Sequence, residues 1–106
     1  MKPFEIIWSH HAENELDKIY KYYAEVASDS IAKKILQDLI SEPNKLRVNP
    51  QLGQCEEWLF DRSVEYRYLL FRQFKLIYTI DFNMNYIKMA DVFDSRQDPQ
   101  RMKRNL

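Results

Sequence analysis

Glycine and cysteine are almost missing from this sequence, which contains one residue of each type among 106. The single cysteine, Cys55, cannot form an intramolecular disulfide, which excludes a disulfide-stapled scaffold and suits a reducing compartment. With so little glycine, the tight turns must use Asn, Asp or Gln, and residues 83–85 are a candidate turn. We predict that the one glycine, Gly53, takes a positive φ where the chain turns into a sheet.

Long apolar runs and metal-ligand spacing are also lacking. No apolar run approaches the ~20 residues that span a bilayer, and residues 1–11 lack the continuous apolar stretch of a signal peptide. The only histidines are the adjacent His10 and His11, far in sequence from Cys55, so we predict no zinc site and no cofactor. We expect both histidines to face solvent. The sequence therefore predicts a single cytoplasmic domain over residues 1–106, without membrane contact.

Neither sign of charge predominates overall, because 16 Lys and Arg balance 16 Asp and Glu. The distribution is uneven, however. Residues 1–61 contain 7 basic and 11 acidic side chains, whereas residues 62–106 contain 9 basic and 5 acidic side chains. The second segment therefore suits an anionic partner such as RNA, DNA or an acidic protein segment. The alternative interpretation is a solvated surface on which like charges happen to gather.

Hydrophobic periodicity predicts an α+β fold. The expected elements are a strand at 4–8, a helix at 12–27 capped by Ser9, a helix at 31–42 capped within 28–30, a short strand at 55–60, and strands at 65–71, 75–81 and 86–93. Apolar alternation is disturbed after Met89, which predicts a bulge near the end of the last strand. Asp98 and Pro99 are expected to begin a short basic helix. The fold is thus an N-terminal strand, a helical hairpin and an antiparallel sheet of about four strands.

Two cations are expected to lie near one another at one end of this sheet. Lys75 opens one strand, and Arg96 follows the end of the next strand after 20 intervening residues. In an antiparallel pair, the start of one strand lies beside the end of its neighbour. Asp94 and Arg96 should therefore enter a loop close to Lys75.

Four segments of the chain carry a family resemblance in their order and spacing. They are FEIIWSHHAENELDKIYKYY, EPNKLRVNPQLG, KLIYTI and VFDSRQDP. Together they resemble the RelE/ParE toxin superfamily of type II toxin–antitoxin systems, which includes plasmid stabilisation proteins, and the last segment is similar to the ParE-like branch. The resemblance implies a bacterial toxin whose partner is a cognate antitoxin protein. That antitoxin would fold on binding and place acidic residues opposite the basic half.

One branch of the superfamily cleaves messenger RNA on the ribosome, which requires cations and proton-transfer groups. The resemblance offers Lys75, Arg96 and Arg67 as cations and Asp94 as a proton acceptor. Asp94 stands where many relatives have histidine, and Met102 stands where RelE itself carries a tyrosine. These departures weigh against a nuclease. Asp94 also has a structural interpretation, as a loop cap or ion-pair partner of Arg96.

The ParE-like branch instead blocks DNA gyrase and is not hydrolytic, so it needs a binding surface only. The candidate contacts are Arg96 and the basic C-terminal residues Arg101, Lys103 and Arg104. About three phosphate contacts would give a salt slope of only roughly −2.7, so tight independent DNA binding is not expected. The sequence favours a ParE-like gyrase inhibitor, with the ribosome-dependent endoribonuclease as the alternative. A non-toxic binding module, or a decayed toxin that keeps the fold, is a third class.

Overall fold

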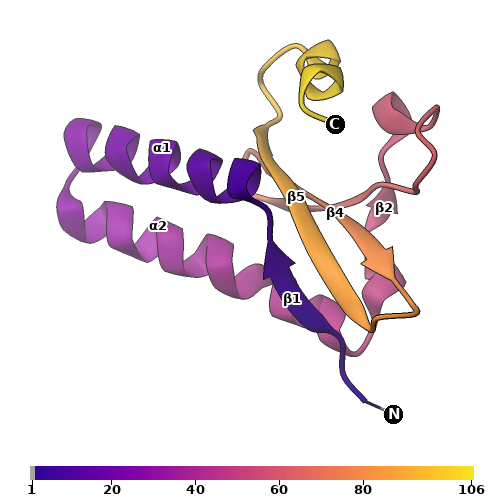
Figure 1. Cartoon of the computed structure of the whole chain (residues 1–106). Coiled ribbons are helices and arrows are strands. Elements are labelled where there is room, and N and C mark those ends of the chain that lie inside the picture. The colour runs from indigo at the N-terminus through magenta and orange to yellow at the C-terminus, as the bar shows by residue number, and fades with distance from the viewer. Residues whose placement is uncertain (1) are drawn as a thin grey trace.

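Two helices lie against one face of a five-stranded sheet in the computed structural model, which describes residues 2–106 (Figure 1). The helices are α1 (His10–Val26) and α2 (Asp29–Ser41), and the strands are β1 (Glu5–Trp8), β2 (Gln54–Cys55), β3 (Arg67–Phe71), β4 (Phe74–Asp81) and β5 (Tyr86–Asp94). The 3₁₀ helices are η1 (Glu42–Arg47), η2 (Pro50–Leu52), η3 (Glu57–Leu59) and η4 (Pro99–Arg104). The predicted α+β fold is confirmed, except that the expected strand at 55–60 is divided between β2 and η3.

The strands follow the order β1-β5-β4-β3-β2 across the sheet. Strands β2 to β5 form the predicted antiparallel set, and β1 joins them in parallel beside β5, with Glu5 opposite Tyr86 and Trp8 opposite Met89. Parallel neighbours need a long connection, and the helices and three further strands provide it here. The N-terminal strand therefore lies directly against the strand that leads to the basic C-terminal segment.

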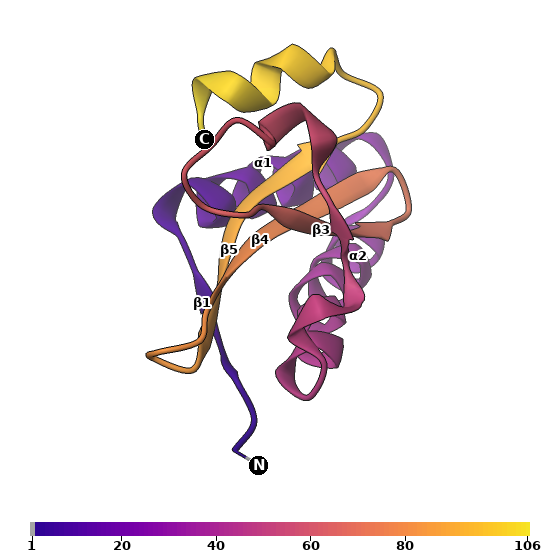
Figure 2. The same ribbon diagram turned by 90° about the vertical axis from the view of Figure 1, so that its right-hand side faces the viewer.

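The two faces of the sheet bury different sets of side chains. On the helix side, Leu76, Tyr78 and Ile87 pack with apolar residues of α1 and α2. On the other side, Ile77 and Phe93 pack with Leu59 of η3 and Met102 of η4. Figure 2 shows η4 lying across the end of β5, next to the segment that contains η3. The basic segment is thus docked on the sheet through Met102, which is 1% exposed.

A bulge interrupts the pairing of β4 with β5, as the disturbed alternation predicts. Tyr78 is opposite Met89 and Ile77 is opposite Asp91, so Ala90 has no partner residue. An extra residue of this kind changes which face the following side chains point to. Met89 and Val92 both lie in the helix-side core, whereas Phe93 lies in the core on the other side. The bulge falls beside the start of α1, because Ser9 Oγ donates to the Ala90 carbonyl oxygen at 3.2 Å.

The predicted caps are confirmed. Ser9 Oγ accepts from Ala12 N at 3.1 Å, and Ser28 Oγ accepts from Ile31 N at 3.1 Å. Asp98 caps η4 by accepting from Gln100 N at 3.0 Å. Asn85 takes the positive φ of 58° that the turn after β4 needs. Among residues 2–106, no helix combines the length and apolar character needed to cross a bilayer.

The prediction of a positive φ at Gly53 is wrong, because its φ is −71° and its ψ is 161°, which is extended backbone. The requirement for glycine comes from a close approach instead. A Cβ at this position would lie 2.5 Å from Tyr78 Oη and 2.6 Å from the Tyr68 carbonyl oxygen. The Tyr78 hydroxyl accepts from Gly53 N at 2.9 Å and donates to the Pro50 carbonyl oxygen at 2.7 Å. The loop before β2 is therefore fastened to the centre of the sheet by a buried tyrosine.

Candidate functional site

Asp94 and Arg96 form a two-bond ion pair where β5 ends. The Arg96 guanidinium donates to both carboxylate oxygens, at 3.0 Å from Nε and 2.8 Å from Nη2, and Arg96 N also donates to Asp94 Oδ1 at 3.0 Å. These bonds lower the pKa of Asp94 below its ordinary value, with the side-chain bond from Arg96 as the largest cause. A carboxylate held in this way is a poor proton acceptor. The geometry thus matches the structural interpretation of Asp94.

Lys75 is held in a second, separate ion pair. Its Nζ lies 2.8 Å from Glu56 Oε2, and the Glu56 side chain is fully buried at 0% exposure. The ammonium also lies 4.4 Å from the centre of the Tyr68 ring. A cation that neutralises a buried carboxylate stabilises the fold, because removing it leaves an unpaired charge in an apolar site.

The register confirms only part of the expected proximity of Lys75 and Arg96. Lys75 pairs with Phe93, and Phe74 pairs with Asp94, so both cations do lie at the same end of the sheet. Their side chains project from opposite faces of the sheet, however. Lys75 meets Glu56 beside η3, whereas Arg96 lines a hollow with Tyr22 and other residues of α1. The sheet therefore separates them, and they form no common site.

Arg67 occupies a third location. Its Nη1 donates to the Gly53 carbonyl oxygen at 2.8 Å, and its Nε lies 2.7 Å from Glu65 Oε1. It thereby fixes the loop before β2. The four residues that the sequence offers for RNA cleavage are thus distributed over three places, and each is already bound to an opposite charge.

The basic C-terminal residues are presented by η4 as an exposed group. Arg101, Lys103 and Arg104 are all exposed, while Met102 between them is buried. Arg62 fixes the end of the segment by donating to the Leu106 carbonyl oxygen at 2.9 Å and to the Lys103 carbonyl oxygen at 3.3 Å. The segment is therefore a docked helix whose cations point away from its anchor.

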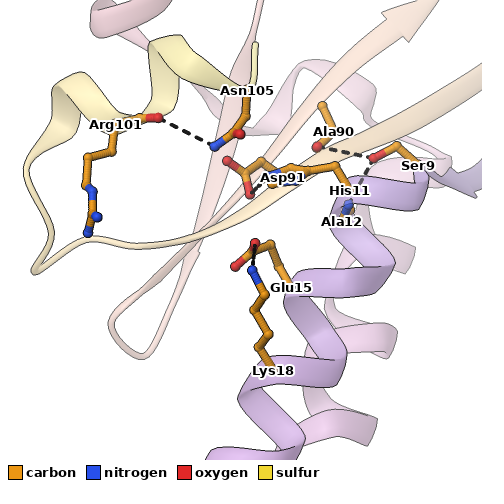
Figure 3. A network of polar contacts seen from close by, with 9 residues as sticks. All are labelled: Ser9, His11, Ala12, Glu15, Lys18, Ala90, Asp91, Arg101 and Asn105. Atoms are coloured by element: carbon orange, nitrogen blue, oxygen red, sulfur yellow. Dashed lines mark hydrogen bonds and ion pairs between the residues drawn. The ribbon is translucent and has the colours of Figure 1, made fainter.

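A histidine and an aspartate that the sequence analysis did not connect form a further polar site (Figure 3). His11 Nε2 lies 3.0 Å from Asp91 Oδ1, where the Asp91 side chain is 2% exposed and the His11 side chain is 32% exposed. The expectation that both histidines face solvent is wrong for His11 and right for His10, whose side chain is fully exposed. Asp91 itself is the signal that could have been noticed, because an acid within a strand buried on both faces needs a partner.

Burial raises the pKa of Asp91, and the adjacent His11 opposes that shift. Asp91 Oδ2 is buried and has no hydrogen-bond partner among residues 2–106. Within the same part of the chain, no three His, Cys, Asp or Glu side chains are grouped so that they could hold a metal ion. The pair is therefore best described as a buried acid that holds a partly exposed imidazole.

Comparisons with known proteins agree with this architecture. The sequence model of a family described as the ParE toxin of the type II toxin–antitoxin system parDE matches residues 6–99. The chromosomal ParDE toxin–antitoxin system from P. aeruginosa is similar, with a TM-score of 0.70 and 20% identity over 86% of this chain and 95% of that chain. The toxin–antitoxin complex RelBE2 from Mycobacterium tuberculosis has a TM-score of 0.61 and 16% identity over 89% of this chain and 93% of that chain.

At these identities the solved structures show a shared fold alone, and no curated protein sequence matches the chain. The family assignment rests on the sequence model, because its match spans nearly the whole sequence and includes both helices and, apart from Glu5, all five strands. This chain therefore belongs to the ParE toxin family of type II toxin–antitoxin systems.

Proposed function

We propose that this toxin inhibits bacterial growth by binding DNA gyrase in the cytoplasm and holding it in a state in which cleaved DNA persists. It acts without hydrolysing a substrate and without a cofactor. A cognate antitoxin neutralises it, and the pair stabilises the plasmid or chromosome segment that encodes it. The ParE family match supports this choice over the RelE-like activity.

The observation that carries the proposal is the separation of the candidate catalytic groups. RNA cleavage needs cations and proton-transfer groups around one phosphate. Here Lys75 is bound to a buried carboxylate, Arg67 to a loop, and Asp94 to Arg96. Binding to a protein target needs no such convergence, only exposed side chains. Arg96, which is 70% exposed, and the cations of η4 supply them.

The His11–Asp91 pair is the specific observation that favours the second candidate, a ribosome-dependent mRNA endoribonuclease. It places the His11 ring beside Asp91 in the second half of β5. The sequence itself has no histidine after Asp91, so this histidine comes from the start of α1. Histidine is the commonest acid–base group in enzymes. The nuclease would then use His11 rather than Asp94 for proton transfer, and Arg101 or Arg104 rather than Lys75 for the phosphate.

Replacing Arg96 with alanine tests the proposed contact surface. We expect the R96A toxin to need roughly tenfold more protein to inhibit gyrase, because a charge-assisted hydrogen bond contributes about 1.5–3 kcal/mol. The measurement is plasmid supercoiling by purified gyrase, together with the amount of cleaved plasmid released by detergent. Lys33→Ala is the matched control, since Lys33 lies on α2 in an exposed ion pair with Asp29.

Equal inhibition by R96A and K33A would remove Arg96 from the contact surface. A wild-type toxin that leaves supercoiling unchanged but cleaves mRNA in a translating extract would replace the gyrase proposal with the second candidate. A toxin that does neither, and whose expression without an antitoxin leaves growth unchanged, would indicate a decayed toxin or a binding module.

A further inference from the structure

A polar cleft of about 790 Å³ lies between α1 and η4. Its walls come from three parts of the chain that are far apart in sequence: the first turns of α1, the end of β5, and η4 with the loop before it. Figure 3 shows His11 and Asp91 between the helix and the C-terminal segment, with Asn105 above them and Glu15 below. This volume lies within the ~300–1,000 Å³ range of small-molecule sites.

Each of the three acids that line this cleft has a partner within the cleft. Glu15 Oε1 lies 3.2 Å from Lys18 Nζ, and Asp17 Oδ2 lies 2.9 Å from Lys21 Nζ. Asp91 is the third acid, and it is bound to His11. Two of the three acids are therefore paired with lysines of α1, and the third is bound to an imidazole.

The two arginines of η4 that line the cleft have no carboxylate partner among residues 2–106. Arg101 Nη1 donates to the neutral Gln97 Oε1 at 3.0 Å. Arg104 takes part in no ion pair with any of residues 2–106. Guanidinium groups that are free of carboxylates offer planar pairs of donors, which match the oxygens of a phosphate group. The wall of the cleft that η4 forms thus carries two guanidinium groups that are not paired with carboxylates.

His11 adds an oriented ring to the opposite wall. Asp91 Oδ1 binds Nε2 from within the protein, and Nδ1 has no hydrogen-bond partner among residues 2–106. When Asp91 is ionised it accepts a hydrogen bond from Nε2–H, which fixes the ring orientation, and Nδ1–H of the imidazolium form is then free to donate to an anion.

We propose that this cleft binds the phosphate group of a nucleotide unit, with Arg101 and Arg104 on the phosphate oxygens and His11 as a third contact. Asp91 is a positioning residue that holds the His11 ring. The amides of Asn14 and Asn105, which also line the cleft, face the remainder of the nucleotide. The unit is either a free nucleotide or one residue of a nucleic acid strand. The site does not depend on gyrase as the target.

The test uses the full-length toxin alone and follows the His11 imidazole signals by NMR. The probes are inorganic phosphate, adenosine monophosphate, and five-residue DNA and RNA strands. We expect the phosphate-bearing probes to shift the His11 signals, and R104A to bind about tenfold more weakly, as loss of a charge-assisted bond requires. K33A should bind like the wild type. Tighter binding of a strand than of the mononucleotide identifies a chain phosphate, and the reverse identifies a free nucleotide.

Asp91→Asn separates positioning from folding. The variant keeps the size of the side chain, and its folded state is checked by the dispersion of the amide spectrum. We expect weaker binding and an altered His11 tautomer in D91N, whereas a purely structural Asp91 would leave both unchanged. The proposal is overturned if no phosphate-bearing probe shifts the His11 signals, or if R104A and K33A bind equally well. Neither result bears on gyrase inhibition, which is measured separately.

Discussion

Replacing Lys75 with methionine is expected to lower the free energy of unfolding by about 3–5 kcal/mol, the usual cost of breaking a buried ion pair. Lys75 is the sole cation within 4.0 Å of the buried Glu56 carboxylate in the described residues, and its own side chain is 19% exposed. Without it, the Glu56 carboxylate retains, among residues 2–106, only the hydrogen bond from Trp58 N at 3.3 Å. Urea unfolding of K75M against the wild type, followed by tryptophan fluorescence, measures the loss.

The double variant E56Q/K75M is the control for this result. It removes both charges, so no unpaired carboxylate remains in the apolar site, and we expect it to recover most of the lost stability. A catalytic Lys75 predicts the opposite pattern, in which K75M abolishes activity while its unfolding midpoint equals that of the wild type. That outcome would contradict the structural role assigned to Lys75.

Gly53→Ala is expected to destabilise the protein by about 3 kcal/mol, at the upper end of the cost of overpacking. The added Cβ would lie 2.5 Å from Tyr78 Oη, and the Tyr68 carbonyl oxygen, at 2.6 Å, is backbone and cannot turn away. Relief of the contact by shifting the loop would break the bond from Gly53 N to the Tyr78 hydroxyl. The thermal midpoint of G53A against the wild type measures the effect.

Tyr78→Phe provides the background that isolates this contact. It removes the nearest atom to the new Cβ, so G53A should cost less in Y78F than in the wild type, although the clash with the Tyr68 carbonyl oxygen persists. A double-mutant cycle gives the coupling directly. If G53A is as stable as the wild type, the loop before β2 is not packed against Tyr78 as described.

The helices, their caps and the strands could be predicted because they depend on local pattern. Ser9 and Ser28 precede apolar residues at helical spacing, and Asp98 precedes a proline that suits the first helical turn. The bulge at Ala90 also has a local signal in the broken alternation. The parallel pairing of β1 with β5 has no such signal, because it depends on how the whole chain is packed.

The site was predictable only in part, for a related reason. The register placed Lys75 and Arg96 at one end of the sheet, as expected. Which face each side chain takes depends on where Glu56 and α1 lie, and this is a matter of tertiary structure. The His11–Asp91 pair joins residues 80 positions apart. The sequence showed only that Asp91 is an isolated acid in an apolar strand, and not that the start of α1 would reach it.

The most direct test of the central claim is to induce this toxin alone in bacteria and pulse-label DNA and protein synthesis during the first minutes. The account predicts that DNA synthesis stops first, because a gyrase held on cleaved DNA blocks replication before it affects translation. The R96A variant should delay this arrest, and K33A should not. Arrest of protein synthesis before DNA synthesis would contradict the account and make His11, Arg101 and Arg104 the candidates for a nuclease site.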